Sequence, residues 1–192
     1  MVTNQKKDST DQLILFFGNS LTAGYNLSLD QSFPMLIQDK IDSLGLNYQV
    51  MNAGNSGETT SGGVERIDWM LKKKVDVFVL ELGANDALRG QSLQEMRKNL
   101  TTILDKVRAK YPQVKMLILG MEAPPNLGKA YTVGFRNVYR DLATKYDAEL
   151  LPFLLKDVAT EPDLLLEDNL HPNAKGQKIV AEHVWEILRP ML

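Results

Sequence analysis

The chain has 192 residues, of which 24% are charged, and its formal net charge is −2 at pH 7. This length suits one domain with a core of its own, and the charge balance gives no sign of a nucleic-acid partner. The chain has no cysteine, which excludes disulfides, thiolate nucleophiles and Cys-based zinc sites. No run approaches the roughly 18 apolar residues of a membrane span, so we expect no stable membrane insertion.

Residues 1–12 are polar and lack the apolar core of a signal peptide. We expect them to be a disordered leader, or the remainder of a targeting segment that has been removed. The sequence is compatible with both. Residues 13–192 are expected to form one domain, since no repeat, low-complexity tract or linker interrupts them.

The first expected strand, residues 13–17, is apolar throughout, as in a strand buried on both faces of a parallel sheet. It ends at Gly18, and a turn of small residues with a single serine, Ser20, follows. In open α/β sheets, ligands bind beyond the carboxyl ends of the strands, so Ser20 lies where active-site residues are usually found. The alternative is that Ser20 caps the next helix.

Strands and helices alternate along the rest of the chain. We expect helices over 33–44, 64–73, 93–110, 131–146 and 174–188, strands over 48–52, 75–82, 114–119 and 150–151, and loops over 53–63 and 124–128. This alternation predicts an α/β fold, a three-layer α/β/α sandwich around a parallel sheet of about five strands. We expect the flavodoxin-like strand order 2-1-3-4-5.

Two histidines are the available imidazole bases. His183 lies inside the amphipathic pattern of the last helix, where a structural role is favoured. His171 lies in a loop, three residues after Asp168. A carboxylate at that distance on a turn can orient an imidazole, as the acid of a Ser-His-Asp triad does. The alternative is a local Asx turn with an exposed histidine.

The sequence motifs of several other classes of enzyme are absent. The chain has no P-loop, no glycine fingerprint of dinucleotide sites, no H-E-x-x-H motif and no G-x-S-x-G elbow. Two scattered histidines do not favour a zinc site. We therefore expect neither a metal nor an organic cofactor.

Four stretches then line up in order: residues 18–24 (GNSLTAG), 52–59 (NAGNSGET), 83–86 (GAND) and 168–171 (DNLH). Together they resemble the four blocks of the SGNH (GDSL) hydrolases, and the similarity runs from about residue 13 to the end of the chain. The chain is most similar to the small bacterial thioesterase–lysophospholipase–arylesterases, which residues 80–83 (LELG) and 125–128 (PNLG) also resemble.

The resemblance implies roles for five residues. Ser20 is the expected nucleophile, His171 the base and Asp168 the acid that orients it. The backbone N–H groups of Ser20 and Gly57 and the side chain of Asn85 are the expected oxyanion hole. Donors that converge on a developing oxyanion stabilise the tetrahedral intermediate of acyl transfer.

Two positions depart from the family pattern. Asn19 stands where the family usually has aspartate, and Ala84 where it usually has glycine. Neither replaces a residue that contacts the reacting atoms in the family mechanism. We therefore expect the activity to be retained, with effects on rate or pocket width.

The resemblance thus implies an esterase that acts on small acyl esters through an acyl-enzyme on Ser20. Lipid-like acyl esters, aryl esters, acyl thioesters and lysophospholipids are the substrates that it suggests. One alternative is a carbohydrate O-deacetylase of the same fold. Another is a non-catalytic domain whose glycine-rich loops hold an anion. The resemblance also implies export to the periplasm or beyond, and the sequence gives no oligomeric state.

Overall fold

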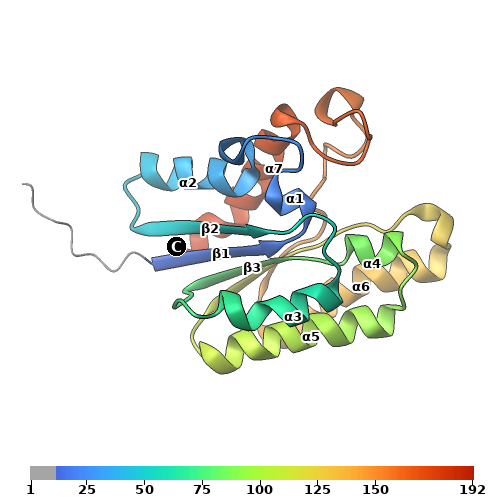
Figure 1. Ribbon diagram of the computed structural model, residues 1–192, viewed down its shortest axis with the longest axis horizontal. Coiled ribbons are helices and arrows are strands. Elements are labelled where there is room, and N and C mark those ends of the chain that lie inside the picture. The colour runs from blue at the N-terminus through green and yellow to red at the C-terminus, as the bar shows by residue number, and fades with distance from the viewer. Residues whose placement is uncertain (1–11) are drawn as a thin grey trace, which may run out of the picture.

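The computed structural model describes residues 12–192, and its centre is a five-stranded parallel sheet (Figure 1). The strands are β1 (Gln12–Gly18), β2 (Tyr48–Gly54), β3 (Val77–Glu81), β4 (Lys115–Leu119) and β5 (Glu149–Leu151). Their order is β2-β1-β3-β4-β5, so the predicted order is confirmed. The leader predicted for residues 1–12 lies outside the described residues, except Gln12, which opens β1.

Helices cover both faces of the sheet. The α-helices of the described chain are α1 (Ser20–Ala23), α2 (Phe33–Ser43), α3 (Thr60–Met70), α4 (Ala84–Leu88), α5 (Leu93–Lys110), α6 (Lys129–Tyr146) and α7 (Ala174–Leu188). Figure 1 shows α2 and α7 on one face and α3, α5 and α6 on the other. The predicted three-layer sandwich is confirmed.

The central strands are buried on both faces, which explains why their sequences do not alternate. Ile14, Leu15, Phe16 and Phe17 of β1 are fully buried, and every residue of β3 is buried. Covering both faces removes all of this apolar surface from water, at about 25 cal/mol per Å². The exception in composition is Glu81, a carboxylate at the end of β3.

The helix predicted for residues 64–73 is misplaced, because α3 covers Thr60–Met70. Thr59 caps it by accepting from the Gly62 N–H, and the Asp86 carboxylate accepts from the Thr60 N–H at 2.9 Å. These contacts start the helix inside the segment predicted as a loop. A side chain at Gly63 would meet Leu82 at 2.6 Å, so glycine there permits close packing on the sheet.

Parallel register brings three turns to one edge of the sheet. Gly18, at the end of β1, pairs with Gly54 of β2 and with Glu81 of β3. The segments that follow these strands carry Ser20, residues 55–59 and residues 83–86. They therefore leave the sheet side by side, at the carboxyl ends where ligands bind in open α/β folds.

Candidate active site

Ser20 is the first residue of α1, directly after β1. The helix is capped by Asn19, whose Oδ1 accepts a hydrogen bond from the Leu21 N–H at 2.9 Å. Ser20 therefore does not act as the cap, and the capping alternative is wrong. The short helix ends at Gly24, which has a φ of 74°. This arrangement holds the serine at the sheet edge with its hydroxyl free to meet another side chain.

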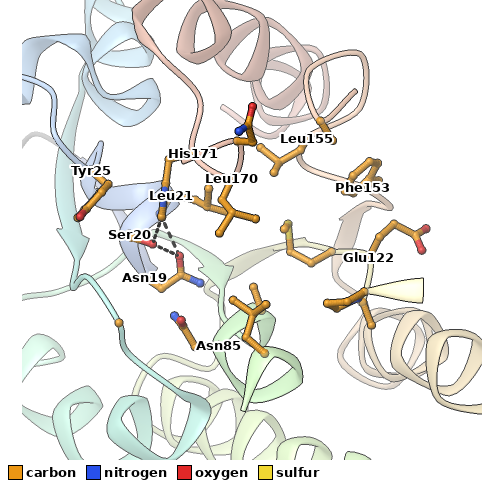
Figure 2. Close-up of a pocket in the computed structure, with 18 of the residues that line it drawn as sticks. Asn19, Ser20, Leu21, Tyr25, Asn85, Glu122, Phe153, Leu155, Leu170 and His171 are labelled. Carbon is orange, nitrogen blue, oxygen red and sulfur yellow. Dashed lines mark hydrogen bonds between the residues drawn. The ribbon is translucent and has the colours of Figure 1, made fainter. Parts of the chain in front are cut away.

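That side chain is His171. The Oγ of Ser20 lies 2.8 Å from Nε2 of His171 (Figure 2). Nδ1 of the same ring lies 2.6 Å from Oδ2 of Asp168. With Nδ1–H donating to the carboxylate, Nε2 is the acceptor for the Ser20 hydroxyl. The three side chains thus form one continuous hydrogen-bonded chain.

The Asp168 carboxylate is held by its own turn. Its Oδ1 accepts from the Leu170 N–H at 2.9 Å and from the His171 N–H at 3.0 Å. Desolvation opposes ionisation, but these two bonds and the His171 ring outweigh it and lower the pKa of Asp168 to about 2. The Asx turn of the alternative is present, but its histidine is half-buried and contacts Ser20.

Gly57 and Asn85 lie around the same pocket as Ser20 and His171. Gly57 has a φ of 80°, which glycine adopts without strain. Asn85 belongs to α4, and its Nδ2 donates to the carbonyl of Glu58 at 3.0 Å. An amide has two N–H donors, so the second remains for the pocket, toward which the side chain points in Figure 2.

The pocket has a volume of about 570 Å³ and largely apolar walls. Its apolar lining comes from Leu21, Tyr25, Ala84, Leu88, Met121, Ala123, Pro124, Pro125, Phe153, Leu155, Ala159 and Leu170. In Figure 2, Phe153 and Leu155 lie on the side of the pocket away from Tyr25. Apolar walls with a few convergent polar groups are typical of a site that binds a small organic molecule.

Neither a metal-binding cluster nor a membrane-spanning helix is found in the described part of the chain. Within residues 12–192, no group of three or more His, Asp or Glu side chains is placed to hold a metal ion. In the same part of the chain, none of the helices has the length and apolar character needed to cross a membrane. His183 lies on α7, with Nε2 3.5 Å from Asp157, and does not line the pocket.

Comparison with known proteins decides the family. The model of the GDSL-like lipase/acylhydrolase family matches residues 16–179. Esterase TesA of Pseudomonas aeruginosa is 35% identical over 182 residues, which cover 94% of this chain and 90% of that protein. The chain belongs to the GDSL-like lipase/acylhydrolase family.

Further relatives agree with this assignment to the GDSL-like family. The thioesterase 1/protease 1/lysophospholipase L1 of Escherichia coli is 35% identical over 93% of this chain and 84% of that protein. A crystal structure of the esterase EstA from Pseudoalteromonas, inhibited by monoethylphosphonate, superposes with a TM-score of 0.88 at 32% identity, covering 94% of this chain and 98% of that one. As a family member, the protein is a carboxylic ester hydrolase of the serine type.

The roles of two residues near Ser20 and His171, namely Tyr25 and Glu81, were not predicted from the sequence. The Tyr25 ring packs on the His171 imidazole, with centroids 4.5 Å apart; nothing in the sequence pattern indicates this contact. Glu81 is 1% exposed and lies behind Asn19, and burial raises its pKa to about 7. A charged residue at the end of an otherwise apolar strand was the available signal.

Proposed function

We propose that this esterase acts through an acyl-enzyme on Ser20, with His171 as base and Asp168 as the group that orients the imidazole. The supporting observation is the chain of contacts from Ser20 Oγ to His171 Nε2 at 2.8 Å and from His171 Nδ1 to Asp168 Oδ2 at 2.6 Å. Hydroxyl, imidazole and carboxylate in this sequence of contacts are the parts of a Ser-His-Asp triad.

In the proposed reaction, His171 Nε2 takes the hydroxyl proton as Ser20 Oγ bonds to the acyl carbonyl carbon. The oxyanion accepts hydrogen bonds from the N–H groups of Ser20 and Gly57 and from Asn85 Nδ2. The imidazolium then gives its proton to the leaving alcohol or thiol as the bond to that group breaks. Water, deprotonated by His171, attacks the acyl-enzyme and releases the acid, which restores the serine.

The apolar walls support substrates with an acyl chain longer than acetyl. Met121, Ala123, Phe153 and Leu155 line the pocket together with Ser20, so an acyl chain on the serine can bury its methylenes there. Each buried methylene contributes about 0.8 kcal/mol. Fatty acyl esters, aryl esters, acyl thioesters and lysophospholipids are the proposed substrate class, in keeping with the names of the relatives.

A substrate panel tests this function. We expect turnover of p-nitrophenyl esters to persist or rise beyond two carbons, with activity also on a lysophospholipid or an acyl thioester. Turnover of acetyl esters alone would instead support the carbohydrate O-deacetylase. A serine-directed phosphonate should label Ser20 and stop turnover, and an unlabelled, inactive protein would support a non-catalytic binding domain.

A further inference from the structure

Glu81 is a buried carboxylate that does not line the pocket but receives three hydrogen bonds from the turn carrying Ser20. Its Oε2 accepts from the Asn19 N–H at 3.0 Å and from Thr22 Oγ1 at 2.8 Å. Its Oε1 accepts from Asn19 Nδ2 at 2.8 Å. A side chain at Gly18 would approach Oε2 to 2.7 Å, so this glycine leaves the space in which the bonds form.

The Asn19 amide links this carboxylate to the serine. Its nitrogen faces Glu81, and its oxygen accepts from the Leu21 N–H at 2.9 Å and lies 3.5 Å from Ser20 Oγ. An amide donates only from nitrogen and accepts only on oxygen. An acceptor at Glu81 therefore fixes which end of Asn19 caps α1 and faces the Ser20 hydroxyl.

We propose that Glu81 is a positioning residue for the Ser20 nucleophile, acting through Asn19, and that asparagine at position 19 supplies the N–H donor that an ionised Glu81 accepts. This inference rests on the proposed function of Ser20. It gives the departure from the usual family aspartate a physical role, because an aspartate here would place two carboxylates at hydrogen-bond distance.

Among the described residues, Glu81 interacts with neutral hydrogen-bond donors and not with a positively charged side chain. The ion pairs within residues 12–192 do not include Glu81. The titratable group facing it from α6 is Tyr139, whose pKa is raised by burial and then by the Glu81 charge, and whose hydroxyl donates to the Leu82 carbonyl. The donors from Asn19 and Thr22 offset part of the desolvation of the carboxylate, whose pKa stays raised at about 7.

Asparagine and aspartate at position 19 differ in how their hydrogen bond to Glu81 depends on pH. Two carboxylates at this distance strongly disfavour double ionisation, so in Asn19→Asp the pair shares one proton near neutral pH. That proton leaves as the pH rises, and the two charges then repel and disturb the turn. Asparagine supplies an N–H donor at every pH, so no shared proton is needed.

A double-mutant cycle tests the Glu81–Asn19 pair by exchanging which of the two residues donates the hydrogen bond and which accepts it. In Glu81→Gln, the new amide nitrogen opposes Asn19 Nδ2, and one amide must turn away. In Asn19→Asp combined with Glu81→Gln, the glutamine nitrogen donates to the aspartate, whose other oxygen still caps the Leu21 N–H. The double variant therefore restores the hydrogen-bond pattern with its direction reversed.

Steady-state kinetics on a short p-nitrophenyl ester near pH 8 provides the readout. For Glu81→Gln we expect a fall in kcat of up to about 10²-fold, the cost of a small misplacement of reacting groups. KM should change little, and phosphonate labelling of Ser20 should slow in parallel. The double variant should regain most of kcat. Above pH 8, Asn19→Asp should lose activity that the double variant keeps.

Controls separate positioning from folding. Asp76→Asn is the matched control, because Asp76 accepts from the Leu13 N–H near the other end of β1. Thermal unfolding of each variant shows whether it is folded. If Glu81→Gln does not fold, the alkaline comparison of Asn19→Asp with the double variant and a smaller loss of kcat in Thr22→Val remain as tests.

The inference is wrong if folded Glu81→Gln keeps the parent kcat, or if the double variant is no more active than its single variants. Either result would leave the proposed function standing as long as Ser20→Ala is inactive. An active Ser20→Ala would instead overturn the proposed function itself.

Discussion

The Ser20 hydroxyl oxygen lies 2.8 Å from Nε2 of His171, although 151 positions separate the two residues in the chain. The parallel sheet makes this possible, because β1 delivers the serine to the edge that the loop before α7 crosses. The contact is the geometric basis of the proposed proton transfer.

Replacement of either partner should therefore abolish most turnover. Ser20→Ala and His171→Ala are each expected to lower kcat by several orders of magnitude, with unfolding midpoints near that of the parent. His183→Ala is the control, since His183 lies outside the pocket. Equal losses in His171→Ala and His183→Ala would show that the base has been misassigned.

Asp168→Asn should impair activity through the imidazole. An amide can present its N–H to His171 Nδ1 and favour the wrong tautomer, a change that costs about 10⁴-fold in the serine protease triad. The measurement is kcat on a p-nitrophenyl ester, with circular dichroism to confirm folding. A variant with the parent kcat would remove Asp168 from the mechanism.

The lowered pKa of Asp168 also has a consequence for stability. A carboxyl group with a pKa of about 2, against its usual 3.8, stabilises the fold while it is ionised, and this contribution is lost as the pH falls through that interval. Denaturant unfolding of parent and Asp168→Asn should therefore converge between pH 4 and pH 2. A difference that is constant with pH would contradict the assignment.

Much of the fold could be predicted from periodicity. The helices α5 and α7 have the predicted bounds, because their apolar faces repeat over many turns. The helices α1 and α4 were not predicted, since they are too short to show a period. The start of α3 depends on the Asp86 bond to the Thr60 N–H, a tertiary contact that local sequence does not contain.

The candidate site divides in the same way. Ser20, Asp168 and His171 stood out from strand ends and short spacing, and the structure brings them together. Glu81 did not stand out as a site residue, because its contact with Asn19 spans 62 positions and forms only when β1 and β3 pair. Sequence marked Asn19 as a departure, and the structure supplies its partner.

Asn85→Ala should slow the chemical step if the amide donates to the oxyanion. Loss of one such donor typically costs about 10²–10³-fold in kcat, with KM nearly unchanged. Because Asn85 also donates to the Glu58 carbonyl, the variant could instead loosen the Gly57 turn. Thermal unfolding distinguishes the two: folded, stable protein that turns over at the parent rate would exclude the oxyanion role.

The last prediction concerns the length of the acyl chain. Ala159 is exposed and lines the pocket, so Ala159→Phe can place a ring in the cavity without disturbing the core. We expect kcat/KM for octanoyl and longer p-nitrophenyl esters to fall, by about tenfold for each 1.4 kcal/mol of lost burial, while acetyl and butyryl esters are hydrolysed as before. Thr160→Phe is the matched control, because Thr160 is also exposed but does not line the pocket. A uniform loss over all chain lengths, or the same profile in both variants, would mean that the acyl chain does not run along this wall.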